Sequence, residues 1–422
     1  MKFSHQDIKS LSGSEGMKPV HFRGGNAVDA PQRTKNTVQQ LTGKGQTIVL
    51  VSNLAWSIMN YRMPVADALM AAGYSVVAVA PVDESVSRLM KQPRMGFYPL
   101  SKFRRNSTSI LAGVQMIWEF YRVYRSIRPD AVIHFGVQAN IFGNIGARLA
   151  GVPSVCVVTG LGYTFLHQGI VPWLTRWLYR ISFLSPKQVV FENQEDLELM
   201  VNKGLVARRN ALRVPGCGID SKAFRPQPGY FNNGKKVFLF IGRLLYDKGL
   251  REYAAAAEQL LKSYPQAECW ILGNLDDENP AHIHREELVR WVQGGYMHYK
   301  GVTDDVRPVI AQCDWVVLPS YREGLSKVLL EAMSMGVPII TTDTPGCSET
   351  VEHGKNGFLV PVKDAQALLD TMQLCCGMPE EERRQMGTLG RKKVVEKYEG
   401  TIVGQAYLSL LQKLGIRNKV SS

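Results

Sequence analysis

Two stretches in the C-terminal half combine charged side chains with glycine turns, as a phosphate-binding site does. In the first, Ile241-Gly-Arg-Leu-Leu-Tyr-Asp-Lys-Gly249 joins an apolar strand to a helix. Gly242 allows a close turn, while Arg243 and Lys248 put two cations at the carboxyl end of the strand. A diphosphate suits this position, because its negative charge grows as it departs. The alternative is a glycine turn beside two solvated charges.

The second stretch, Ser320–Pro338, holds two carboxylates with seven residues between them, Glu323 and Glu331. Ser326 is suited to cap a helix that Gly336 ends. Three backbone N–H groups then belong to a helix N-terminus, which attracts phosphate: those of Gly324, Leu325 and Ser326. One carboxylate can accept hydrogen bonds from sugar hydroxyls and the other from ribose hydroxyls. The alternative for Glu331 is a paired, structural carboxylate.

The elements that must position these residues alternate between apolar strands and helical patterns, in two series. The first series has candidate strands at 47–53, 75–81, 131–135, 154–158 and 188–192. The second has candidate strands at 237–241, 268–272, 314–318 and 337–341. Continuous apolar strands separated by helices indicate parallel sheets covered on both faces. We therefore predict an α/β protein with two Rossmann-like, doubly wound domains facing a cleft, with ligands at the carboxyl ends of strands.

The chain has 422 residues, more than one hydrophobic core usually serves. Residues 1–45 are polar and lack periodicity, which predicts a mostly disordered tail. We expect an N-terminal, acceptor-side domain at 46–220 and a linker at 221–236. A donor-binding domain follows at 237–400, and 401–422 form a C-terminal helix and tail.

The C-terminal motifs resemble those of retaining glycosyltransferases of family 4, which have the GT-B fold. The resemblance rests on Gly-Arg-Leu-x3-Lys-Gly at 242–249, Glu-x7-Glu at 323–331 and Pro-Gly-x2-Glu at 345–349. Each motif is weak alone, but their joint order and spacing are specific. The resemblance covers about residues 46–400.

The resemblance implies a role for each matching residue. Arg243 and Lys248 would bind the donor diphosphate after the turn at Gly242. Glu323 and the amides of the next three residues would hold the donor sugar and phosphate, and Glu331 would hold the ribose. Glu323, Arg243 and Lys248 are thus the predicted catalytic residues. The family needs no metal, and we expect no metal and no cofactor here.

The N-terminal half resembles a narrower group of the family, whose members extend undecaprenyl-diphosphate-linked sugars, several with N-acetylgalactosamine. The similarity lies in Val158-Thr-Gly-Leu-Gly-Tyr-Thr-Phe165, after Gln138-Ala-Asn-Ile-Phe-Gly143. The acceptor-side candidates are His134, Asn140 and Thr159. His134 could equally be a satisfied core histidine, and Thr159 stands where many members have histidine.

The positive charge is concentrated in the N-terminal half. The chain has a net charge of +13, and residues 1–220 carry 25 Lys and Arg against 13 Asp and Glu. Ile110–Arg128 and Ile170–Lys187 mix arginines with tryptophan and tyrosine, which suits an anionic membrane surface. The alternative is two sheet-covering helices with an ordinary solvated face. We see no nucleic-acid-binding module, and therefore expect no nucleic-acid partner.

The location expected from the sequence is cytoplasmic, peripheral on the inner face of the plasma membrane. The first residues lack the apolar core of a secretory signal. The longest uncharged run, between Arg148 and Arg176, is interrupted repeatedly by glycine and proline, which argues against a transmembrane helix.

The predicted function is retaining transfer of a hexose or N-acetylhexosamine, with N-acetylgalactosamine favoured, in surface glycan synthesis. The donor would be a UDP-sugar and the acceptor a lipid-linked (undecaprenyl-diphosphate) saccharide. A GT-B sugar-nucleotide epimerase, a transferase with a soluble acceptor and an inactive membrane-docked binding protein are alternatives. A dinucleotide-dependent oxidoreductase is disfavoured, because no Gly-x-Gly-x-x-Gly follows the first strand of either half.

Overall fold

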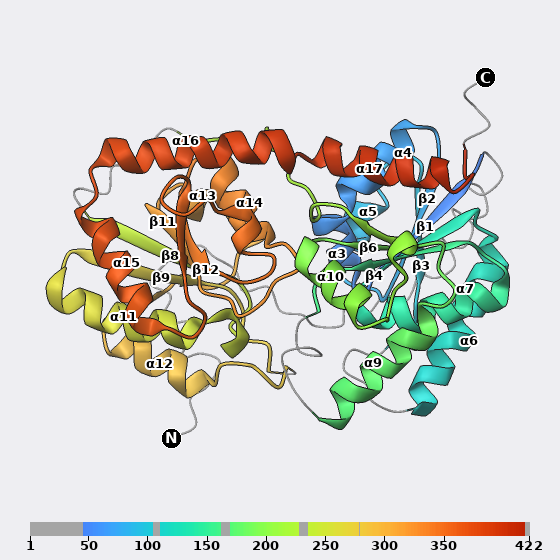
Figure 1. The fold of residues 1–422 in the computed structure, drawn as a ribbon, viewed down its shortest axis with the longest axis horizontal. Helices are drawn as coiled ribbons and strands as arrows, with labels where there is room; N and C mark the ends of the chain where they lie inside the picture. Colours follow the sequence, from blue (N-terminus) through green and yellow to red (C-terminus); the bar gives the residue numbers. More distant parts are fainter. Residues whose placement is uncertain (1–44, 104–109, 162–168, 228–234, 278, 418–422) are drawn as a thin grey trace. The chain divides into compact units, whose positions relative to one another are not determined.

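The computed structural model describes residues 45–103, 110–161, 169–227, 235–277 and 279–417 (Figure 1). These residues divide into two compact units. The N-terminal unit contains the described residues up to Gly218 and takes back the chain from Gly400 onward. The C-terminal unit is Ile219–Glu399. Each unit is an α/β domain of its own.

The N-terminal unit is built on a seven-stranded sheet in the order β3-β2-β1-β4-β5-β6-β7. All of its strand pairs are parallel. The strands are β1 (Thr47–Val51), β2 (Ser75–Ala80), β3 (Met95–Pro99), β4 (Ala131–Phe135), β5 (Ser154–Val158), β6 (Gln188–Phe191) and β7 (Ala211–Arg213). Both faces of β1 are apolar and buried, because Ile48 and Leu50 join one core cluster while Val49 and Val51 join another. This explains the unbroken apolar run in its sequence.

Helices cover both faces of this sheet. They are α3 (Ala55–Tyr61), α4 (Met63–Ala71), α5 (Val86–Leu89), α6 (Ile110–Ile127), α7 (Asn144–Ala150), α9 (Ile170–Ser182), α10 (Gln194–Asn202) and α17 (Gly400–Lys413), with a π-helix η1 (Ala139–Gly143) and a 3-10 turn η2 (Arg208–Asn210). α4 and α17 pack over the face of Ile48 and Leu50. α6 and α7 pack over the opposite face.

The C-terminal unit has a six-stranded parallel sheet in the order β10-β9-β8-β11-β12-β13. Its strands are β8 (Lys236–Ile241), β9 (Ala267–Leu272), β10 (His298–Tyr299), β11 (Trp315–Leu318), β12 (Ile339–Thr342) and β13 (Gly357–Val360). Its helices are η3 (Tyr246–Lys248), α11 (Leu250–Ser263), α12 (Arg285–Gln293), α13 (Arg307–Ile310), α14 (Lys327–Ser334), η4 (Ser348–Thr350), α15 (Ala365–Gly377) and α16 (Glu380–Lys397). The predicted fold class, two doubly wound parallel-sheet domains, is confirmed.

The units divide at different residues from those we expected. Ile219 already belongs to the C-terminal unit, where its N–H donates to the Tyr398 carbonyl at 3.0 Å. α17, expected as a separate C-terminal helix, completes the core of the N-terminal unit. Its Gly404 lies so close to α4 that a Cβ there would be 2.5 Å from the Pro64 carbonyl oxygen. Residues 1–44 of the expected tail and 228–234 of the expected linker lie outside the described residues.

Two features that the described residues lack concern membranes and metals. None of the helices in those ranges is both long and apolar enough to cross a bilayer. The same ranges contain no group of three or more His, Cys, Asp and Glu side chains able to hold a metal ion.

Candidate functional site

Apart from Glu331, which lies on α14, the predicted donor residues lie in the connections that leave one edge of the C-terminal sheet. β8, β11 and β12 are neighbouring parallel strands, so the loops that follow them start at the same edge. Backbone hydrogen bonds join these loops. The Tyr321 N–H donates to the Asp247 carbonyl at 2.9 Å, and the Glu323 N–H donates to the Pro345 carbonyl at 3.1 Å. Motifs that are far apart in the sequence therefore form one continuous surface.

Three buried hydroxyls bind the same loops together. Ser320 Oγ donates to the Asp247 carbonyl at 3.2 Å, and Thr344 Oγ1 donates to the Tyr321 carbonyl at 2.8 Å. Thr342 Oγ1 donates to the Ser320 carbonyl. Sequence reasoning missed the two threonines. Their signal is a polar residue at the end of a buried strand, Thr342, and another two residues later, Thr344; an apolar residue at either position would leave the carbonyl without this bond.

Two glycines make this close approach possible. Gly346 has a φ of +75°, and a Cβ there would lie 2.4 Å from the Gly324 carbonyl oxygen. Gly249 has a φ of +71°, and a Cβ there would lie 2.0 Å from the Pro319 carbonyl oxygen. Any side chain at either position would force the loops apart.

Both predicted diphosphate cations are present at this edge, each beside a carboxylate. Lys248 Nζ forms an ion pair with Glu323 Oε1, and both side chains are largely buried. Arg243 Nη1 donates to Asp276 Oδ2 at 2.9 Å, with the arginine side chain 46% exposed and the aspartate 8%. Arg243 therefore has the surface that a bound anion needs, and Lys248 is joined directly to the predicted sugar-binding carboxylate.

α14 begins beside this ion pair. Ser326 occupies its N-cap position, but its side chain makes no capping hydrogen bond, so the predicted cap is wrong in that detail. The Ser326 N–H donates to the Gly346 carbonyl at 3.3 Å, because the loops pack so closely. That amide is already engaged within the protein. Gly324 and Leu325 are buried in the turn that leads into α14.

Glu331 lies one to two turns along α14 and is 7% exposed. Its Oε1 is 3.3 Å from Lys327 Nζ. Burial raises the pKa of this carboxyl above its ordinary value, and the nearby Lys327 charge opposes the rise. This ion pair with Lys327 is what the alternative interpretation of Glu331, a paired structural carboxylate, predicts.

The acceptor-side candidate His134 lies inside the N-terminal unit. Its ring is fully buried on β4, with Nε2 2.9 Å from Tyr124 Oη. A Cβ at Gly143 would lie 2.7 Å from the ring, so backbone covers it closely. Burial lowers the pKa of His134 to about 3 and keeps the imidazole neutral. These contacts support the core-histidine alternative rather than an acceptor contact.

Asn140 is also fully buried, and its side-chain amide forms hydrogen bonds with the backbone of β5. Nδ2 donates to the Val157 carbonyl at 2.8 Å, and Oδ1 accepts from the Val157 N–H at 3.2 Å. An acceptor cannot reach this side chain, because β5 already uses both of its polar groups. Thr159 is the one candidate with exposed surface; it directly follows β5 and is half-buried. The Gly162–Phe165 part of the subgroup motif lies outside the described residues.

The comparisons with known proteins agree with this arrangement in both units. Residues 58–217 match the model of a glycosyl transferase 4-like domain, and residues 235–376 match that of glycosyl transferases group 1. The chain is similar to solved structures with the same fold. Sucrose-phosphate synthase of Thermosynechococcus elongatus superposes with a TM-score of 0.74 at 19% identity, over 88% of this chain and 99% of that one. Anabaena Alr3699/HepE in complex with UDP and glucose gives 0.71 at 17% identity, over 86% and 99%.

Two curated relatives are similar to this chain, one over most of its length and one over about two thirds of it. The N,N'-diacetylbacillosaminyl-diphospho-undecaprenol alpha-1,3-N-acetylgalactosaminyltransferase of Campylobacter jejuni is 28% identical over 386 residues, 87% of this chain and 98% of that protein. The UDP-Gal:alpha-D-GlcNAc-diphosphoundecaprenol alpha-1,3-galactosyltransferase of Escherichia coli is 24% identical over 276 residues, 63% and 70%.

The fold and the charged edge of the C-terminal sheet define an enzyme of the GT-B class. The two matched models cover most of both units, and the chain belongs to the family 4 glycosyltransferases. The resemblance stated from the motifs is thereby confirmed, as is transferase activity.

Proposed function

We propose that the protein transfers N-acetylgalactosamine or a related sugar from a UDP-sugar to an undecaprenyl-diphosphate-linked saccharide, with retention of the anomeric configuration. The observation that carries the proposal is the joining of Lys248 and Glu323 at the edge where Arg243 and α14 also lie. The acceptor class is supported by the Campylobacter relative, whose name specifies such a transfer and whose length the chain matches almost completely.

In the proposed donor complex, Arg243 and Lys248 bind the diphosphate and Glu323 accepts hydrogen bonds from the sugar hydroxyls. Glu331 accepts hydrogen bonds from the ribose hydroxyls, in exchange for part of its contact with Lys327. The start of α14 adds the positive end of a helix dipole. Thr159 is the acceptor-side residue that we retain, because it has surface at the carboxyl end of β5.

The proposed reaction is a same-face displacement. The acceptor hydroxyl attacks the anomeric carbon, the bond from that carbon to the UDP oxygen breaks, and the departing phosphate oxygen takes the hydroxyl proton. Glu323 is tied to Lys248, which makes it a poor nucleophile and a good anchor for the sugar. The residues of the site then act by positioning and by stabilising charge on the leaving diphosphate.

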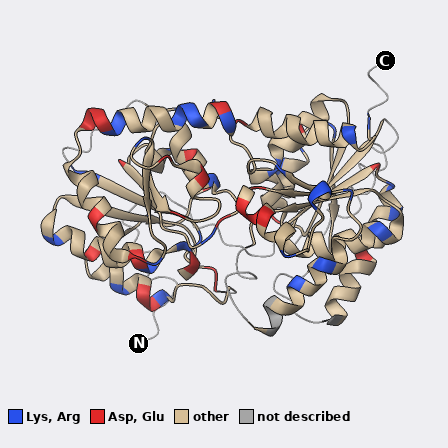
Figure 2. Cartoon of the chain, viewed as in Figure 1, with Lys and Arg blue, Asp and Glu red and all other residues tan. Residues whose placement is uncertain are grey.

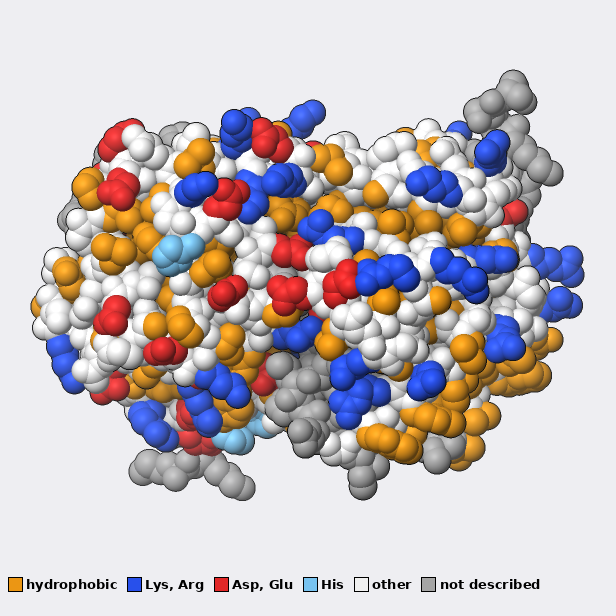
Figure 3. All heavy atoms as spheres, in the orientation of Figure 1, with side chains coloured by type: hydrophobic (Ala, Val, Ile, Leu, Met, Phe, Trp, Pro, Cys, Tyr) orange, Lys and Arg blue, Asp and Glu red, His pale blue; other side chains and the backbone are white. Residues whose placement is uncertain are grey.

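The proposal includes peripheral binding to the inner face of the plasma membrane through an apolar face on α6 and α9. Six large side chains at helical spacing form this face, each between 37% and 66% exposed: Leu111, Val114, Trp118, Trp173, Trp177 and Ile181. Arginines accompany them along both helices (Figure 2). Hydrophobic side chains gather over this end of the N-terminal unit (Figure 3). Exposed tryptophans beside arginines suit the boundary between headgroups and acyl chains of an anionic membrane.

A transfer assay with the full chain tests the function. UDP-N-acetylgalactosamine is supplied with an undecaprenyl-diphosphate-linked saccharide, with the same saccharide free of lipid, or without acceptor. A product on the lipid-linked saccharide alone supports the proposal, and proton NMR of the new linkage checks retention. Transfer to the free saccharide indicates a soluble acceptor, and conversion of the nucleotide sugar without acceptor indicates an epimerase. Either of these two results contradicts the proposed acceptor.

A further inference from the structure

The connection between β9 and α12, residues Gly273–His284, is bound along the turn that carries Arg243. The Leu244 N–H donates to the Asn274 carbonyl at 3.0 Å, and the Tyr246 N–H donates to the Ala281 carbonyl at 2.7 Å. The Ile283 N–H donates back to the Leu244 carbonyl at 2.9 Å. Both ends of the connection are therefore fixed to the two sides of Leu244, next to Arg243.

The connection also starts in direct contact with Gly242. A Cβ on Gly273 would lie 1.7 Å from the Gly242 carbonyl oxygen, so only glycine permits this approach. Within the connection, the Asn279 N–H donates to the Asp276 carbonyl at 2.8 Å, and Asn279 Oδ1 accepts from the Ala281 N–H at 2.9 Å. Asn279 thus bonds to the carbonyl of Asp276 and to the N–H of Ala281.

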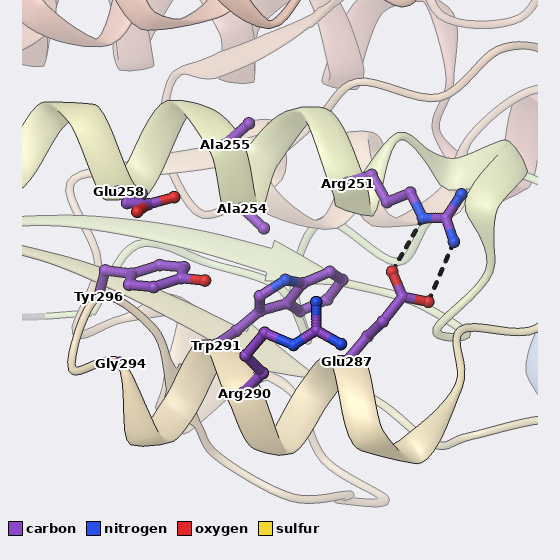
Figure 4. Close-up of a pocket in the computed structure, with 9 residues that line it drawn as sticks. All are labelled: Arg251, Ala254, Ala255, Glu258, Glu287, Arg290, Trp291, Gly294 and Tyr296. Atoms are coloured by element: carbon purple, nitrogen blue, oxygen red, sulfur yellow. Dashed lines mark hydrogen bonds and ion pairs between the residues drawn. The ribbon is translucent and has the colours of Figure 1, made fainter.

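A second bond network fixes the other end of the Arg243 turn. Tyr246 Oη donates to Glu287 Oε2 at 2.6 Å, and the Arg251 guanidinium lies 3.7 Å above the Tyr246 ring. Arg251 and Glu287 pair through two bonds, Nε to Oε1 at 2.9 Å and Nη2 to Oε2 at 3.1 Å (Figure 4). The turn is therefore held on one side by the β9–α12 connection and on the other by the first turns of α11 and α12.

Beside this frame the Arg243 side chain is 46% exposed, and the buried Asp276 pairs with it. Arginine has many rotamers, whereas a buried aspartate has few. Asp276 Oδ2 accepts from Nη1 at 2.9 Å, and a guanidinium carries five N–H donors in a fixed fork. Holding one nitrogen therefore sets the directions of the others.

We propose that Asp276 is a positioning residue that orients Arg243 toward the donor diphosphate. This inference rests on the proposed role of Arg243 in binding that diphosphate. The negative charge of Asp276 does not itself favour a bound anion nearby. Asp276 therefore contributes by orienting the Arg243 guanidinium. The aligned guanidinium stabilises the charge that develops on the leaving group, and misalignment slows the reaction more than it weakens binding.

Asp276→Ala tests the proposal in the full chain. We expect kcat to fall by about 10- to 100-fold, while the Kd for UDP, measured by calorimetry, changes by less than about threefold. Asp276→Asn keeps an oxygen acceptor and should recover most of kcat. Asp277→Ala is the matched control, because Asp277 is the next residue in the connection and is exposed. It should leave kcat unchanged.

The double variant Asp276→Ala/Arg243→Ala separates positioning from a structural role. If Asp276 acts through Arg243, the double variant is no slower than Arg243→Ala alone. Additive losses, or equal losses of kcat and UDP affinity with a lowered Tm, would overturn the proposal. So would an unchanged kcat in Asp276→Ala when Arg243→Ala is impaired. Near-normal activity of Arg243→Ala would instead overturn the proposed role of Arg243.

Discussion

The two units share one architecture but differ in what lies at the carboxyl ends of their strands. In the C-terminal unit, the connections after β8, β9, β11 and β12 bring together two cations, two carboxylates and three hydroxyls that bind neighbouring loops. In the N-terminal unit, two of the three acceptor-side candidates, His134 and Asn140, are fully buried. His134 lies within β4 and Asn140 within η1, whereas Arg243 and Lys248 follow β8 and keep exposed surface. A charged residue that follows a strand at the sheet edge and keeps exposed surface is therefore better evidence of a site than a polar residue buried inside an element.

The largest expected effect concerns the two cations of the C-terminal edge. Arg243→Ala and Lys248→Ala should each lower kcat/KM by about 10²- to 10³-fold, or about 3–4 kcal/mol, because each removes a charge beside the leaving group. Steady-state kinetics with folded variants, checked by circular dichroism, measure this. Lys235→Ala, a change at an exposed lysine of the same unit, is the control. A variant of either cation with near-normal kcat/KM would remove the contrast between the units.

His134 should affect stability and not the acceptor. Its folded pKa of about 3 lies below the ordinary 6.5, so the unfolded chain binds the proton more readily. Stability is then lost as pH falls from 6.5 toward 3, by about 2 kcal/mol at pH 5. In His134→Gln this part of the pH dependence should be absent from urea-unfolding curves at pH 5 and pH 8. A raised KM for the acceptor at pH 8 would show that His134 belongs to a site after all.

The apolar face on α6 and α9 gives a third contrast between the units, because we propose membrane binding for the N-terminal unit alone. Trp173→Ser with Trp177→Ser should weaken binding to vesicles with anionic lipid by about tenfold or more, because two exposed aromatic side chains no longer enter the interface. Sedimentation at low and high salt measures the partition, and salt should loosen the wild type by screening its arginines. Leu374→Ser, at an exposed leucine of α15, is the matched control. Unchanged binding at low salt in the double variant would contradict the membrane assignment.

The smallest expected effect concerns Glu331. Because its pKa is raised by burial, UDP affinity should begin to fall at a higher pH than for an exposed glutamate, as the protonated carboxyl loses strength as an acceptor. Lys327→Met removes the charge that opposes the rise, so the loss should begin at a still higher pH. Calorimetric titrations with UDP from pH 5 to pH 8 measure a change of a few fold. In Glu331→Gln this pH dependence should be missing; its persistence would exclude Glu331 as the group responsible.

Nine of the strands could be predicted from the sequence because each is a short apolar run, whereas β3, β7, β10 and β13 are not among the candidate strands. The three donor motifs could be recognised because their glycines and charges are regularly spaced. The hydrogen-bond partners of the side chains in these motifs could not be predicted from the sequence. Asp276 meets Arg243 only because β9 lies beside β8, and Thr342 reaches Ser320 only because β12 lies beside β11. Strand order decides such contacts, and the sequence does not state it.

The position of α17 was unpredictable for a related reason. Its apolar residues show that it packs on something, and the nearest unit in the sequence is the C-terminal one. It instead supplies Val403, Tyr407 and Leu411 to the core that contains β1 and β2. The helix pattern contains no information about which surface it meets.

This return of the chain has a consequence for how the protein is made. The strands of the N-terminal unit leave the ribosome before the C-terminal unit does, yet the core of the N-terminal unit lacks α17 until Gly400–Lys413 has been added. The C-terminal unit, Ile219–Glu399, has all of its residues earlier. Synthesis therefore completes the second unit before the first, and α4 keeps its apolar surface uncovered throughout that interval. A nascent chain halted near residue 399 would display that surface to chaperones, and one released after residue 417 would not.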